Sequence, residues 1–155
     1  MTVDALADYP RTVVLTDGLH IVLRPMSPGD ADRLGALRPG ARDRLSVDAG
    51  HAVVLAWDGE RVAAAAVLER RGDTGAVRIA IDPDYAGRRL GTWMLLDLVH
   101  LGAAMGFGTL EAAVPAADAP YREALRRLDF VEDRERSSPA EAVLVKALHA
   151  SWPDF

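Results

Sequence analysis

The chain has 155 residues, a formal net charge of −5 and no cysteine. This length suits one domain with a sizeable core, and a composition that is 50% hydrophobic and 26% charged is typical of a globular protein. The acidic balance argues against general nucleic-acid binding, and the absence of cysteine excludes disulfides, thiolate metal ligands and a cysteine nucleophile. No apolar run approaches the ~20 residues of a membrane-spanning helix, and the N-terminus has no signal pattern, so we expect a cytoplasmic protein.

The N-terminal half is predicted to contain two hairpins separated by a helix. Residues 1–11 are expected to form a loose arm. Asp17-Gly18 and Asp58-Gly59 each lie between two apolar runs, which is a strong signal for a β-hairpin. Ser27 and Pro28 favour a helix start as cap and first helical residue. The expected strands are 13–15, 19–23, 51–57 and 61–69, and the expected helix runs from Ser27 with Leu34 and Leu37 on its buried face.

The run of four alanines at 63–66 has helical propensity. We nevertheless assign it to a strand because Val62 and Val67 flank it and a hairpin turn precedes it. Residues 38–50, in contrast, are rich in turn formers and give only a weak pattern.

The C-terminal half alternates strands and helices. The predicted order is a strand at 77–81, a long apolar helix that continues to Met105, a strand at 109–114, a helix at 118–128 capped by Asp118, and strands at 130–131 and 142–148. Trp152 and Phe155 in the tail are expected to cover an apolar patch or meet a second subunit, which leaves a homodimer open. We therefore predict one domain over residues 1–155 with an α/β (α+β) fold, in which helices flank a mixed, mostly antiparallel central sheet.

The loop between the strand at 77–81 and the long helix is the first candidate for function. Gly87-Arg88-Arg89-Leu90-Gly91 enters the helix directly, and the first N–H groups of a helix have no partner inside it. These donors and the positive end of the helix dipole favour an anion, most often a phosphate. The alternative is an ordinary strand-to-helix connection with solvated arginines.

Four segments resemble the GCN5-related N-acetyltransferases, and together they cover nearly the whole chain. Leu23-Arg24-Pro25 with Gly29-Asp30 is similar to the opening strand and helix of that family, and Ile79–Tyr85 to the end of its central strand. Gly87–Thr92 is similar to its acetyl-CoA loop, and Asp118–Phe130 to its later helix. The opening YPRTVVLTDGLHIVLRPMSPGD is more specifically similar to acetyltransferase domains that modify protein lysines.

The resemblance implies acetyl-CoA as co-substrate and an amine, such as a protein lysine, as acceptor. The pyrophosphate of coenzyme A needs N–H donors at a helix start, and its pantetheine arm is a chain of amides that can pair with a strand edge. The implied binding residues are Ala80, Ile81 and Asp82 for the arm, and Gly87, Arg88, Arg89, Leu90, Gly91 and Thr92 for the pyrophosphate.

The sequence departs from the family pattern at several positions. Ala86 stands at the first position of the loop motif and Arg89 at its first glycine, so Arg89 needs an unusual backbone conformation or a phosphate partner. Leu125 replaces the usual tyrosine, and Asp118 the usual asparagine, of the later helix. Ala76 holds the position of the glutamate found in the lysine-modifying relatives.

Two residues are candidates for the proton transfers. Glu111, on the strand after the long helix, is the candidate general base, and Tyr121, one helical turn before Leu125, is the candidate acid for the departing thiolate. A solvent-facing glutamate and a tyrosine near a helix cap are the alternatives. His51 and His100 are weaker candidates, and no cluster has metal-ligand spacing.

Three functions follow from these residues. The first is an N-acetyltransferase that moves an acetyl group from acetyl-CoA to a primary amine. The second is a catalytically weak or inactive acyl-CoA-binding sensor or scaffold, which the missing tyrosine and glutamate favour. A nucleotide-phosphate binder of another class is disfavoured because no P-loop or GxGxxG motif follows a strand. The short segment 38–50 suggests an open acceptor cleft that suits a protein lysine.

Overall fold

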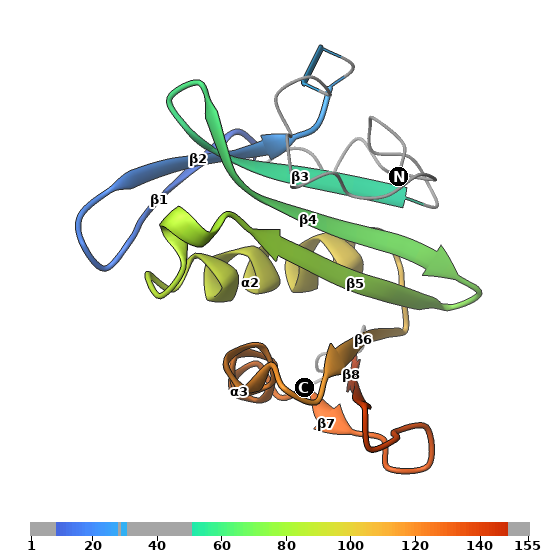
Figure 1. The fold of residues 1–155 in the computed structure, drawn as a ribbon. Coiled ribbons are helices and arrows are strands. Elements are labelled where there is room, and N and C mark those ends of the chain that lie inside the picture. The colour runs from blue at the N-terminus through green and yellow to red at the C-terminus, as the bar shows by residue number, and fades with distance from the viewer. Residues whose placement is uncertain (1–8, 28, 31–50, 149–155) are drawn as a thin grey trace, which may run out of the picture.

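The chain folds around one eight-stranded sheet with helices α2 and α3 (Figure 1). The computed structural model describes residues 9–27, 29–30 and 51–148. The elements are β1 (Arg11–Val14), β2 (His20–Pro25), β3 (His51–Asp58), β4 (Arg61–Arg71), β5 (Thr74–Ile81), the 3-10 helix η3 (Pro83–Tyr85), α2 (Leu90–Ala104), β6 (Thr109–Pro115), α3 (Ala119–Arg127), β7 (Val131–Glu132) and β8 (Glu141–Ala147).

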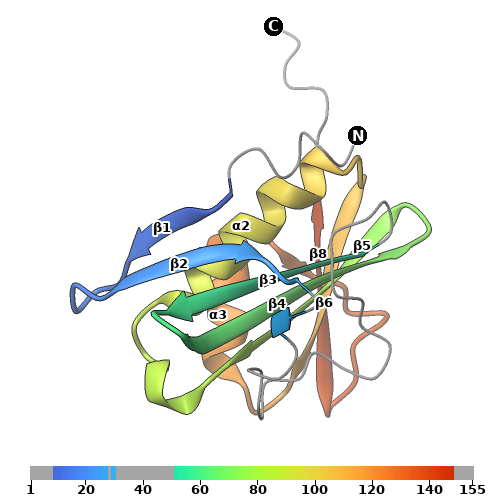
Figure 2. The same ribbon diagram turned by 90° about the horizontal axis from the view of Figure 1, so that it is seen from above.

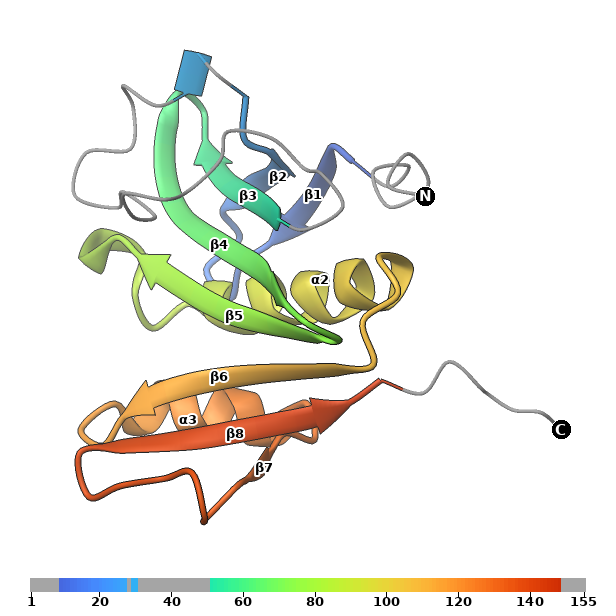
Figure 3. The same ribbon diagram turned by 90° about the vertical axis from the view of Figure 1, so that its right-hand side faces the viewer.

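The strand order is β1-β2-β3-β4-β5-β6-β8-β7, and every neighbouring pair is antiparallel except β5 and β6. This confirms the predicted mixed, mostly antiparallel sheet. Strand β8 does not close the sheet but lies between β6 and β7. Strands β5 and β6 start side by side and separate toward their C-terminal ends (Figure 3).

Alternate side chains of the strands divide the core between the two faces of the sheet. On β3, Ala52, Val54 and Ala56 belong to the cluster that also contains Leu95 and Leu98 of α2. The intervening Val53, Leu55 and Trp57 are buried in a second cluster on the other face. This period of two is the pleat of a strand covered on both faces, and it explains why β3 and β4 are apolar throughout. Figure 2 shows α2 crossing the sheet.

Both predicted hairpins are confirmed. The β1–β2 and β3–β4 pairs are antiparallel, and Gly18 and Gly59 have φ angles of 89° and 62°, which other residues rarely adopt. The alanine run 63–66 lies in β4, so its place in the sheet overrides its helical propensity. Strand β5 begins at Thr74 rather than at the expected Val77.

The residues before β1 contact helix α2. Tyr9 packs against the core, its hydroxyl donates to Asp97, and Arg11 pairs with the same carboxylate at 2.8 Å. Asp97 is 3% exposed, so these partners hold a buried charge. The end of the expected loose arm is thus tied to the domain. Residues 1–8, most of the helix expected from Ser27, segment 38–50 and the aromatic tail lie outside the described residues.

In the described part of the chain, no helix has the length and apolar character needed to cross a membrane.

Candidate functional site

The central feature of the site is the separation of β5 from β6. The two strands pair in parallel only at Thr74–Ala76, whereas β5 pairs with β4 as far as Ile81. The Asp82 N–H donates to the Ala63 carbonyl at 2.9 Å, which fixes the alternation of the β4–β5 ladder. Even-numbered residues of β5 therefore direct their backbone groups toward β4. The backbone groups of Ile79 and Ile81 face the split, beyond the last parallel pair of β5 and β6, Ala76 and Glu111.

This alternation sorts the three residues predicted for the pantetheine arm. Only Ile81 turns its backbone groups to the open edge. Ala80 and Asp82 turn theirs to β4, so their amides are not available to a ligand in the split. Ile79 also turns its backbone groups to the open edge, and the sequence analysis did not predict it as a binding residue. The alternation of a strand shows that every second residue turns its backbone groups to the same edge. Only the register with β4 decides which set of residues faces the split.

The loop into α2 presents free N–H groups. Gly87 and Arg89 both have positive φ, 78° and 67°, and the first backbone bond into the helix runs from Trp93 N–H to the Arg89 carbonyl at 3.2 Å. Within the described residues, no protein acceptor pairs with the N–H groups of residues 87–92. Arg89 adopts the left-handed conformation that the family glycine would take. This entrance to the helix is suited to an anion.

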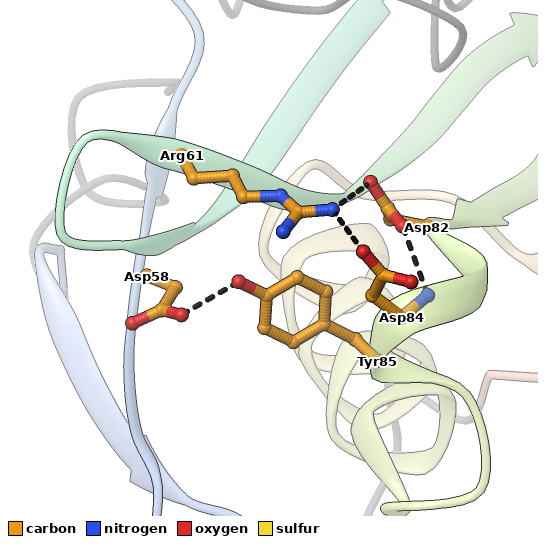
Figure 4. A network of polar contacts seen from close by, with 5 residues as sticks. All are labelled: Asp58, Arg61, Asp82, Asp84 and Tyr85. Carbon is orange, nitrogen blue, oxygen red and sulfur yellow. Dashed lines mark hydrogen bonds and ion pairs between the residues drawn. The ribbon is translucent and has the colours of Figure 1, made fainter.

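A polar network fixes the turn that precedes this loop (Figure 4). The Tyr85 hydroxyl donates to Asp58 at 2.6 Å, and Arg61 donates to Asp82 and Asp84 at 2.9 and 2.7 Å. The hydrogen bond from the Asp84 N–H, and to a smaller extent the one from Arg61, lowers the pKa of the Asp82 carboxyl. The Asp82 side chain thus caps η3, which is a structural role for this carboxylate.

The cations around the loop are arranged differently from the prediction. Arg88 pairs with Asp17 of the β1–β2 turn at 3.2 Å and does not line the adjoining cavity. Arg89 lines it, and so does Arg127 from the end of α3. Arg127, which lies 3.9 Å from Glu123, was not among the predicted binding residues. Its closeness to the loop depends on how α3 packs beside α2, which the sequence does not show.

Two cavities open on either side of the split. The first, of about 580 Å³, is lined by Ile79, Ile81, Gly87 and Arg89, by the start of α2, and by Ala124 and Arg127 of α3. We call it the loop-side cavity. The second, of about 340 Å³, has walls from Ala65 and Val67 of β4, Ala80 of β5, and Ala113 and Pro115 of β6. We call it the far cavity.

The two cavities share Ile79, Asp118 and Tyr121. These residues form the junction between the cavities, with Ile79 on β5 and the other two at the start of α3. Two groups that can exchange protons therefore lie where the cavities meet.

The Tyr121 hydroxyl is buried and has no hydrogen-bond partner in the described structure. Burial, followed by the charge of Asp118, raises the pKa of this phenol, so it stays protonated at neutral pH. Leu125, which replaces the usual family tyrosine, is fully buried in the core. The phenol of Tyr121, one turn earlier on α3, lies at the junction instead. The protonated phenol keeps an O–H group that can donate to a ligand.

Glu111 lies outside both cavities. Its two carboxylate oxygens contact Arg136 at 3.0 and 3.1 Å, and Arg71 is 3.9 Å away. A carboxylate held by a guanidinium and away from the junction is not placed to accept a proton there, which argues against the predicted base. His100 is exposed on α2 and lines neither cavity. The described residues contain no group of side chains that suits a metal ion.

A family model and several solved structures match this chain. The model of the acetyltransferase (GNAT) family matches residues 19–130. The GNAT domain of S. lividans PAT is 17% identical, with 92% of this chain and 98% of that chain covered and a TM-score of 0.79. A putative acetyltransferase from Salmonella typhimurium, solved with its cofactor acetyl-CoA, is 15% identical, with 86% and 96% covered and a TM-score of 0.64. These two likenesses establish the fold.

A cAMP-binding acyltransferase from Mycobacterium smegmatis is 25% identical, with 94% of this chain covered and a TM-score of 0.69. The match takes in 50% of that protein, so the chain spans about half of its length. None of the curated proteins matches the sequence of this chain.

Proposed function

Because the chain belongs to the acetyltransferase (GNAT) family, we propose that it is an N-acetyltransferase that moves an acetyl group from acetyl-CoA directly to a primary amine. The observation that carries this proposal is the junction of the two cavities at Ile79, Asp118 and Tyr121. Direct transfer requires that donor and acceptor approach one centre from separate spaces, and the split sheet provides such an arrangement.

In this proposal acetyl-CoA occupies the loop-side cavity. The free N–H groups of residues 87–92 would hold its diphosphate, with Arg89 and Arg127 as counter-charges. The open edge of β5 at Ile79 and Ile81 would pair with the pantetheine amides as a further strand does. The residues present therefore fit a molecule with a diphosphate at one end and a chain of amides in between.

The acetyl thioester supplies the activated acyl group, and the residues of the junction assist its transfer. An N–H of the β5 edge is available to stabilise negative charge on the carbonyl oxygen. Tyr121 would donate its proton to the departing sulfur, because it lines both cavities and its phenol is neutral and has no partner in the described structure. The far cavity would receive the amine.

Ligand-dependent melting tests the first half of the proposal. A ligand that binds only the folded state raises the apparent stability, so acetyl-CoA and CoA should raise the Tm and ATP should not. Arg127→Gln should reduce the shift, while Arg134→Gln, an exposed arginine outside both cavities, should not. An ATP response without a CoA response would discard the proposal.

Release of free CoA thiol in the presence of amines tests the second half. Acetyl-CoA binding without thiol release to any amine would favour a sensor or scaffold over an enzyme. Acetylated amine detected by mass spectrometry, in the same amount as the thiol, would separate transfer from simple hydrolysis of the thioester.

A further inference from the structure

We propose that Asp118 binds the ammonium group of the acceptor and takes up its proton, so that the acceptor is a primary alkyl amine on an apolar stem. This inference rests on the proposed function and assigns the substrate class of the same site. It starts from the observation that Asp118 supplies the one carboxylate in the described lining of the far cavity and also lines the loop-side cavity.

The position of the Asp118 carboxylate is fixed by its place in the chain. Strand β6 ends at Pro115, and the Asp118 N–H donates to the Pro115 carbonyl at 2.9 Å, which closes a tight turn before α3. One carboxylate oxygen, Oδ1, accepts from the Tyr121 N–H at 3.2 Å as the helix cap. No described residue donates to the other oxygen, Oδ2. The cap therefore orients the side chain and leaves one oxygen for a ligand.

The surroundings of Asp118 favour a cation with an apolar stem. The half-buried carboxylate carries its charge at the edge of a cavity whose other walls are mostly Ala, Val and Pro. A charge that is partly removed from water attracts an ion of opposite sign more strongly than one at the surface. Arg78, the charged residue on the wall formed by β5, is exposed. The Asp118 end of the cavity would thus hold the ammonium while a methylene chain lies along the apolar wall, as for a lysine side chain.

The step that follows balances as a direct transfer. The bound ammonium first gives one proton to Asp118 Oδ2, and from there to solvent, because nitrogen attacks only with a free electron pair. The neutral amine nitrogen then forms a bond to the thioester carbonyl carbon, and the carbon–sulfur bond breaks with its electron pair on sulfur. As the nitrogen loses electron density, a second proton becomes acidic and passes to Asp118 Oδ2, and from there to solvent. The sulfur takes the Tyr121 proton, which solvent replaces. The products are the acetylated amine, CoA thiol and one released proton for each ammonium consumed.

The test compares two acceptors in wild type and in Asp118→Asn. Asparagine is an equally good helix cap, so this substitution removes the charge and keeps the turn. The acceptors are a lysine with its α-amine blocked, which is an ammonium at neutral pH, and an aniline, which is neutral. A proton acceptor contributes typically ~10²–10⁴-fold, so kcat/KM for the lysine should fall at least about 100-fold. For the aniline it should change by less than about threefold, because the acidic nitrogen formed from an aryl amine releases its proton to water.

The control is Asp129→Asn, which removes the same charge at the other end of α3. Asp129 is exposed, has a positive φ that asparagine tolerates and lines neither cavity, so both acceptors should react as with wild type. The Tm shift with acetyl-CoA should be kept in both variants. Equal losses for lysine and aniline in Asp118→Asn, or no loss for lysine, would overturn the role of Asp118 while leaving the transferase intact. A wild type that transfers acetyl to neither acceptor would overturn the proposed function and this inference together.

Discussion

Replacing Tyr121 by phenylalanine is expected to raise the stability of the protein and to lower its activity. The hydroxyl is buried without a partner, and a buried polar group that makes no hydrogen bond costs about 1–3 kcal/mol. Tyr121→Phe removes that cost and keeps the ring, so we expect the free energy of unfolding to rise by about 1 kcal/mol in the ligand-free protein. For a domain of this size the Tm should increase by roughly 2–4 °C.

The same change at another tyrosine provides the matched control. The Tyr85 hydroxyl donates to the Asp58 carboxylate at 2.6 Å, and a hydrogen bond to a charged group is worth about 1.5–3 kcal/mol. Tyr85→Phe should therefore lower the free energy of unfolding by that amount. Urea unfolding followed by fluorescence, with both variants measured under one condition, shows whether the free energy of unfolding rises in Tyr121→Phe and falls in Tyr85→Phe.

The activity of Tyr121→Phe should fall although the protein becomes more stable. If the phenol protonates the departing sulfur, kcat should drop by about 10²–10⁴-fold while the Tm shift with acetyl-CoA persists. A variant that is both less stable and less active would mean that the hydroxyl has a partner in solution and that its effect is structural. Full activity would remove Tyr121 from the mechanism.

Further expectations concern the loop, the paired glutamate and the phenol. Arg89→Gly should change stability by less than about 1 kcal/mol, since relief of the positive φ offsets the entropy of glycine, yet should weaken acetyl-CoA binding most at low salt in a Kd titration. Glu111→Gln should keep kcat/KM within about twofold in the thiol assay, and a 100-fold loss would restore its role as base. Arg61→Gln, which frees Asp82 and Asp84, should raise the KM for acetyl-CoA with kcat unchanged. Because burial raises the pKa of Tyr121, its ionisation leaves the free energy of unfolding unchanged below its unfolded pKa of ~10 and lowers it as the pH rises further. The stabilities at pH 9 and 11 should therefore differ less in Tyr121→Phe than in wild type.

The parts of the fold that local chemistry specifies were predictable from the sequence. The two Asp-Gly turns place φ-positive glycines between apolar runs, and both produce the expected hairpins. Asp118 was predicted as the cap of the later helix, and its side chain does accept from Tyr121 N–H. These features depend on a few neighbouring residues, so tertiary packing has little opportunity to override them.

The prediction of Glu111 as the general base depended on contacts that are distant in sequence. The period of a strand gives two faces but not which neighbours each face meets. Glu111 stands opposite Ala76 at the last parallel pair of β5 and β6, just before the split, and Arg136 lies 25 residues later in the chain. Neither the end of the pairing nor the approach of Arg136 has a signal within the strand itself.

The location of the junction follows from chain direction rather than from any motif. A parallel pair that opens toward its C-terminal ends brings the residues that follow β6 to the widest part of the split (Figure 3). Pro115 ends β6, so the next turn and the first turn of α3 must lie there, whatever side chains they carry. The helix cap at Asp118 and the residue three positions later, Tyr121, therefore reach the junction by topology. A tyrosine at the position of Leu125 would start one turn further along the helix, where Leu125 packs in the core. Although leucine replaces the family tyrosine at position 125, Tyr121 still brings a phenol to the junction.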